Sequence, residues 1–208
     1  MPVELTCRAV SGRAYANALC ADALALLTIL SLEHGELSLL LLSDSDIRRL
    51  NREFRGKDQA TDVLSFPQLE AAQQPKPARA AARRDAPPLA LGDIVISIDT
   101  ARRLARELGE TISGRVRTLL IHGMLHLLGY DHERSMAEAR RMFAREHELA
   151  ALMEAGAAQS RSRLKKTPAA AATVSSRANE AGDSRWSPAA MPARDSKAVK
   201  KSGLARRP

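Results

Sequence analysis

The sequence has few aromatic residues and no apolar run long enough to cross a membrane. Phe, Trp and Tyr make up 3% of the 208 residues, so the core has to be built from Leu, Val, Ile and Ala. The most apolar stretch, residues 23–32, is about half the length that a membrane-spanning helix needs. The N-terminus also lacks the basic start and long apolar segment of a signal peptide. We therefore expect a cytoplasmic protein without membrane contact.

Cysteine is equally scarce. Cys7 and Cys20 are too few for a disulfide framework and too far from the histidines for a thiolate metal site. We expect both to be buried thiols in a reducing compartment.

The net charge of +8 lies at the end of the chain. Residues 155–208 contain twelve Lys and Arg against three acidic residues, a net of +9, which leaves residues 1–154 at −1. This last segment is rich in Ala, Ser, Arg, Lys and Pro and has no periodicity, so we expect a basic disordered tail. The tail could contact RNA phosphates, or it could be a solvated extension without a partner.

Apolar periodicity predicts alternating strands and helices over residues 1–154, which we interpret as one domain. The expected strands cover residues 3–9, 36–42, 61–66 and 92–97, and the expected helices cover residues 14–32, 44–52, 99–108, 113–128 and 135–153. Residues 68–90 contain four prolines and no apolar periodicity, which is typical of a flexible surface insertion. The pattern predicts an α+β (α/β-like) fold with one small mixed sheet packed with helices.

Three of the five histidines lie within eleven residues. His122 and His126 are four apart, so they share one face of the expected helix and can bind one cation. Gly129 should end that helix and let the chain fold back, so that His132 supplies a third nitrogen. Three protein ligands leave the fourth tetrahedral position open, which is typical of a catalytic zinc site. We expect one Zn²⁺ per chain, bound on a central helix and the turn after it.

The same histidine spacing occurs in metzincin proteases, but one residue differs. Those enzymes have Glu directly after the first histidine as the general base, and this chain has Gly123 there. A metalloprotease would therefore need its base from elsewhere. The other two histidines, His34 in an expected turn and His147 on an expected charged helix, have no comparable neighbours and receive no role.

Three segments together resemble the YbeY family of zinc-dependent bacterial endoribonucleases. Residues 122–132 resemble its metal-binding motif, residues 50–67 a second motif and residues 91–97 a third, in the order of the family. The resemblance covers about residues 3–153. Ala60 stands where the family usually has Pro, and the 68–90 insertion and the 155–208 tail lie outside the usual extent of the family.

The resemblance implies a function and a further site residue. It implies single-strand-specific cleavage of RNA in maturation of the 3′ end of small-subunit (16S) rRNA and in ribosome quality control. The implied partners are rRNA and the small ribosomal subunit. Arg55 matches a family arginine implicated in activity, and its guanidinium fork suits two phosphate oxygens. Two alternatives stay open: a metalloprotease-like zinc hydrolase and a non-catalytic ribosome assembly factor with a structural zinc.

Three aspartates near these motifs have roles that the sequence leaves open. Asp131 could orient an imidazole or could cap the turn before His132. Asp62 and Asp93 should shape turns or caps, with lining of the cleft as the alternative.

Overall fold

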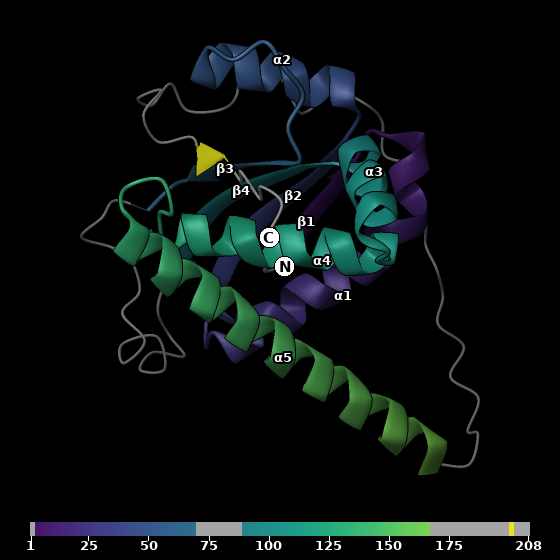
Figure 1. The fold of residues 1–208 in the computed structure, drawn as a ribbon. Coiled ribbons are helices and arrows are strands. Elements are labelled where there is room, and N and C mark those ends of the chain that lie inside the picture. Colours follow the sequence, from purple (N-terminus) through teal and green to yellow (C-terminus); the bar gives the residue numbers. More distant parts are fainter. Residues whose placement is uncertain (1–2, 70–88, 167–199, 202–208) are drawn as a thin grey trace.

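The structure is a computed structural model that describes residues 3–69, 89–166 and 200–201 (Figure 1). The strands are β1 (Val3–Cys7), β2 (Gly35–Leu42), β3 (Val63–Pro67), β4 (Leu89–Ser97) and the two-residue β5 (Lys200–Lys201). The helices are α1 (Arg13–Ile29), α2 (Asp44–Arg55), α3 (Ile98–Leu108), α4 (Ile112–Leu127) and α5 (Met136–Lys166), with a short 3₁₀ turn, η1 (Val10–Gly12), before α1.

All strands belong to one sheet in the order β1-β2-β4-β3-β5. β1, β2 and β4 run parallel, whereas β3 pairs antiparallel with β4 and β5 pairs antiparallel with β3. The predicted α+β fold with a small mixed sheet is therefore confirmed. Gly92 is needed for the β3–β4 pairing, because its φ is +131° and a Cβ there would lie 2.2 Å from the carbonyl oxygen of Phe66.

Helices cover both faces of the sheet (Figure 1). Alternate residues of β2 point to opposite faces, so Leu40 and Leu42 pack beneath α2, while Leu39 and Leu41 join the larger core on the side of α1 and α4. α5 packs on α1 and α4 as an outer layer. α4 contacts β3, β4, α1, α3 and α5, which makes it the central helix of the fold.

Several element boundaries differ from those predicted. α1 ends at Ile29 rather than residue 32, because the chain turns at Ser31, whose φ is +55°. α2 runs to Arg55, three residues beyond the expected end, and stops where Gly56 adopts a left-handed conformation. α3 begins at Ile98, one residue before the predicted start, and is capped by Ser97, whose hydroxyl accepts from Thr100 N.

The largest difference concerns α5, which extends to Lys166 instead of residue 153. Residues 155–166, predicted to be disordered, are therefore helical. β4 begins at Leu89, so the last two residues of the predicted insertion (68–90) belong to a strand instead. Residues 70–88, 167–199 and 202–208 lie outside the described residues, so a flexible insertion over residues 70–88 and a disordered remainder of the tail stay predictions, as does the division at residue 154.

In the described part of the chain, no helix combines the length and apolar character needed to cross a membrane. The thiols of Cys7 and Cys20 are free and half-buried rather than fully buried as expected. Burial raises the pKa of the Cys7 thiol, and this shift is partly offset by Arg13.

Candidate metal centre

α4 brings the first two histidines into the interior. Thr111 caps the helix by accepting from Gly114 N at 3.0 Å, and residues 119–127 in its second half are all apolar apart from Gly123 and the two histidines. A helix that is apolar all round is buried, and His122 and His126 are accordingly 0% and 1% exposed. The helix begins at Ile112 and ends at Leu127, each one residue before the predicted bound.

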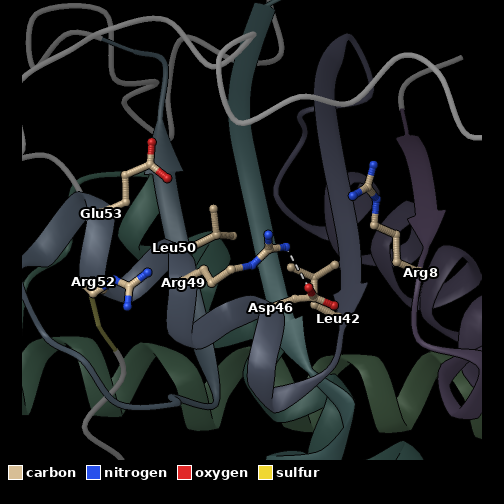
Figure 2. Close-up of a pocket in the computed structure, with 7 residues that line it drawn as sticks. All are labelled: Arg8, Leu42, Asp46, Arg49, Leu50, Arg52 and Glu53. Carbon is tan, nitrogen blue, oxygen red and sulfur yellow. Dashed lines mark hydrogen bonds and ion pairs between the residues drawn. The ribbon is translucent and has the colours of Figure 1, made fainter.

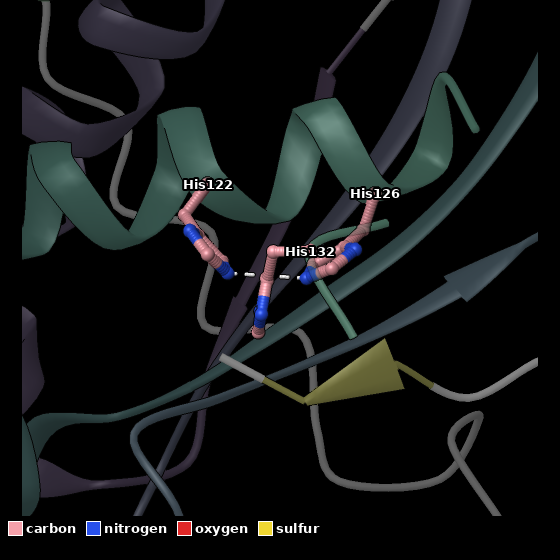
Figure 3. A group of neighbouring side chains, drawn as sticks. All are labelled: His122, His126 and His132. Carbon is pink, nitrogen blue, oxygen red and sulfur yellow. Dashed lines mark hydrogen bonds between the residues drawn. The ribbon is translucent and has the colours of Figure 1, made fainter. Parts of the chain in front are cut away.

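The turn after α4 brings in the third histidine. Gly129 has a φ of +90°, and Tyr130 N donates to the carbonyl oxygen of Leu125 at 3.0 Å, which closes the helix end and reverses the chain. His132 then faces the two helical histidines (Figure 3). The candidate ligand atoms of the three residues lie within 4.8 Å of one another. The juxtaposition that the spacing predicted is therefore present.

The hydrogen bonds made by Nδ1 of His122 and of His126 determine which nitrogen of each ring is free to bind a metal ion. His122 Nδ1 lies 3.2 Å from Glu146 Oε2, and His126 Nδ1 lies 3.0 Å from the carbonyl oxygen of Tyr130. A carboxylate and a backbone carbonyl only accept, so each Nδ1 has to carry the hydrogen. In a neutral imidazole the lone pair is then on Nε2, the atom that a metal ion binds.

These two lone pairs converge on one point. His122 Nε2 and His126 Nε2 lie 3.1 Å apart. Two lone pairs at this distance repel each other unless a cation or a proton lies between them. Nitrogens that share one tetrahedral zinc ion, each bonded at about 2.0–2.1 Å, are separated by roughly 3.3 Å. The donor set and its spacing therefore fit a metal ion.

His132 differs from the other two because it is half-buried. Its ring stacks on that of Phe143 with centroids 5.9 Å apart and an interplanar angle of 20°. The centre is thus enclosed on the side of α4 and reaches the surface on the side of His132.

Gly123 explains why no protease base occupies this position. A Cβ at residue 123 would lie 2.9 Å from Ile94 Cγ2 and 3.1 Å from Ser65 Oγ, so this side of α4 lies against β3 and β4. Ser65 also donates to the carbonyl oxygen of Gly123 at 3.3 Å. A glutamate side chain does not fit between helix and sheet here, which argues against a metzincin mechanism.

Arg55 lies on the helix that covers the other face of the sheet and contacts the segment that carries His132. It is the last residue of α2, and its Nη2 lies 3.4 Å from Glu133 Oε2, on the residue next to His132. Its side chain is 10% exposed, and Nη1 is buried with no hydrogen-bond partner among the described residues. A buried donor without a partner is costly, so this guanidinium would gain from a ligand that accepts a hydrogen bond. Arg55 is therefore largely buried and is not a surface arginine.

Each of the three aspartates accepts a hydrogen bond within the fold. Asp131 caps the turn, since its Oδ1 accepts from Glu133 N at 3.0 Å. Asp62 Oδ1 accepts from Val63 N at the start of β3. Asp93 accepts from Gln68 Nε2 at 3.2 Å, and burial raises the pKa of its carboxyl although hydrogen bonds oppose the shift. Neither Asp62 nor Asp93 belongs to the histidine cluster.

The two histidines without an assigned role lie apart from the cluster. His34 is in the turn before β2, as expected, and His147 is on the exposed side of α5.

A separate cavity of about 380 Å³ lies between α2 and the end of β1 (Figure 2). It is lined by Arg8, Leu42, Asp46, Arg49, Leu50, Arg52 and Glu53, and by none of the candidate site residues. Within this lining, Arg49 forms an ion pair with Asp46 at 2.8 Å.

Sequence reasoning missed Glu146. The signal was present in α5, because Met142, Leu149 and Met153 are buried at helical spacing and Glu146 falls on the same face. A charged residue on such a face indicates a buried partner. The partner, His122, is 24 residues away.

Comparisons with known proteins show the family of this chain. The sequence model of the family described as "Endoribonuclease YbeY" matches residues 12–154. The chain belongs to this endoribonuclease family. It is 50% identical over 150 residues to the endoribonuclease YbeY of Anaeromyxobacter dehalogenans, covering 72% of this chain and 70% of that protein. It is 46% identical over 123 residues to that of Leptospira interrogans, covering 57% of this chain and 87% of the relative.

A solved structure supports the fold. The solution structure of TM1509 from Thermotoga maritima matches with a TM-score of 0.51 and 24% identity, covering 77% of this chain and 95% of that one. Membership of the YbeY family makes this chain a nuclease of the hydrolase class.

Proposed function

We propose that this protein is a zinc-dependent endoribonuclease that cleaves single-stranded RNA. The observation that carries the proposal is the convergence of the Nε2 lone pairs of His122 and His126 at 3.1 Å, with His132 completing a three-nitrogen set. Three neutral imidazoles suit zinc, and a set of three leaves a coordination position for substrate or water. When bound there, zinc would act as a Lewis acid toward a water molecule and a phosphoryl oxygen.

Arg55 would hold the phosphate of the scissile bond. Its Nη1 has no internal hydrogen bond to give up, and its contact with Glu133 keeps the guanidinium beside the segment that carries His132. A guanidinium can donate two parallel hydrogen bonds to phosphate oxygens, which stabilises negative charge as it builds up. Burial strengthens such an interaction, because less water screens it.

We further propose that the substrate is the 3′ end of small-subunit (16S) rRNA and that the protein acts on the small ribosomal subunit in its maturation and quality control. Family membership and the endoribonuclease names of the relatives support this proposal. Contact between the basic tail and RNA phosphates stays a prediction.

The experiment compares RNA with protein as substrate. Purified protein, with and without chelator, is incubated with single-stranded RNA, with duplex RNA of the same sequence and with casein. We expect cleavage of the single strand alone, lost on chelation and restored by zinc. Zinc-dependent casein cleavage with intact RNA would show the protease alternative to be correct. Binding to small subunits with no cleavage of any substrate would favour the assembly factor.

A precursor of 16S rRNA bound in small subunits then tests the proposed substrate. We expect shortening at its 3′ end by the wild-type chain and none by His126→Ala. Equal processing by both proteins would show that the histidine cluster has no part in it.

A further inference from the structure

Two residues of α5 contact the rings of two candidate zinc ligands. Glu146 Oε2 lies 3.2 Å from His122 Nδ1, and Phe143 stacks on His132. The two residues are three apart, so they project from the same side of the helix. Met142, Leu149 and Met153 fix this side against the core, since they are at most 5% exposed. α5 is therefore held firmly enough to set the position of both rings.

The carboxylate of Glu146 is largely buried and interacts with His122. Its side chain is 13% exposed, and among the described residues its hydrogen bond goes to His122 Nδ1. A largely buried carboxylate is costly unless positive charge lies close by. A neutral imidazole does not supply that charge, but a divalent cation on the opposite nitrogen of the same ring does. A metal ion bound to His122 would therefore offset the cost of burying the Glu146 carboxylate.

We propose that Glu146 is a positioning residue of the metal centre, which fixes His122 with its hydrogen on Nδ1 and thereby strengthens zinc binding at Nε2. A carboxylate that accepts from a ligand imidazole orients the ring and makes it a better donor, and the loss of such a partner weakens metal binding by about 10- to 100-fold. The inference rests on the proposed zinc site.

The first test measures zinc affinity in Glu146→Gln by competition with a chromophoric chelator. Glutamine keeps the size of the side chain and an acceptor oxygen but removes the charge. We expect binding about 10- to 100-fold weaker than in the wild type. Glu148→Gln is the matched control, since Glu148 lies on the same helix, is 58% exposed and pairs with Arg145, and it should bind zinc like the wild type.

Thermal unfolding of the metal-free proteins separates positioning from a structural role. Removal of a nearly buried charge should leave the unfolding midpoint of metal-free Glu146→Gln at or above that of the wild type, while its zinc affinity falls. A lower midpoint with unchanged zinc affinity would mean that Glu146 serves only the packing of α5 and would overturn the proposal.

A measurement on the wild-type chain needs no variant. Two-bond ¹H–¹⁵N correlations of the metal-free, histidine-labelled protein report which ring nitrogen carries the hydrogen. We expect a hydrogen on His122 Nδ1. A neutral His122 with its one ring hydrogen on Nε2 would overturn the proposal even if Glu146→Gln failed to fold. The zinc titration of the wild type keeps the two hypotheses distinguishable. Absence of zinc binding there refutes the proposed function, whereas equal binding by wild type and Glu146→Gln refutes this inference alone.

Discussion

Replacement of Arg55 by Met should separate activity from stability. Met keeps most of the apolar stem of the side chain but removes the guanidinium. The buried Nη1 has no partner, and a buried unpaired donor costs about 1–3 kcal/mol, which the variant regains. The lost ion pair with Glu133, whose side chain is 51% exposed, is worth about 1 kcal/mol or less. We therefore expect the variant to be as stable as the wild type, or more stable by up to about 2 kcal/mol.

The effect on RNA cleavage should be much larger. Loss of one preorganised donor to a charged transition state lowers kcat by about 10²- to 10³-fold. Urea unfolding and cleavage of single-stranded RNA are measured on the same samples. Arg52→Met is the control. Arg52 lies one turn earlier on α2, its side chain is 62% exposed, and its contact with Asp58 is long, at 3.7 Å. Cleavage at the wild-type rate by a destabilised Arg55→Met would refute the reasoning and make Arg55 a structural residue.

Three further predictions concern stability. Gly123→Ala should be destabilised by about 1–3 kcal/mol, because its Cβ would lie 2.9 Å from Ile94 Cγ2. Gly156→Ala should gain about 0.5–1 kcal/mol, because a Cβ added there would point into open space. Equal unfolding midpoints of the two variants would contradict the close approach of α4 to the sheet. Burial would raise the pKa of Asp44, but hydrogen bonds from Ser97, Thr100 and Arg103 outweigh it and lower that pKa, so Asp44 stabilises the fold above its unfolded pKa and this stability is lost as the pH falls. Asp44→Asn should therefore be less stable than the wild type in urea at pH 7, with the gap closing below about pH 4; a gap that is independent of pH would show that the charge is unimportant. The raised pKa of Asp93 has the opposite sign, so Asp93→Asn should be at least as stable as the wild type at pH 7, and a clear loss of stability there would contradict the cost of its burial.

The histidine cluster could be predicted because its geometry is local. The four-residue spacing on one helix places His126 relative to His122, and the left-handed Gly129 places His132. Both features can be recognised in the sequence. The contacts that support the cluster are different in kind. Glu133 and Arg55 are 78 residues apart, so their contact depends on how the end of α2 and the turn after α4 are placed in the fold.

The length of α5 was predicted too short because the prediction used apolar periodicity. Apolar periodicity detects helices that pack against a core, and α5 beyond Met153 does not show this periodicity. Residues 155–166 are nevertheless rich in Ala, Gln, Arg, Leu and Lys, which favour helix by intrinsic propensity, so the helix continues. The cap at Ser97 was missed because this residue also ends β4, and the strand pattern masked its second role.

Titration of the metal-free protein with zinc, with cleavage of single-stranded RNA followed at each step, tests the proposed function most directly. The proposal predicts cleavage that rises with added zinc and levels off at one ion per chain, and no rise in His126→Ala. Full cleavage before any zinc is added, or zinc binding by the wild type without cleavage at any ratio, would contradict it.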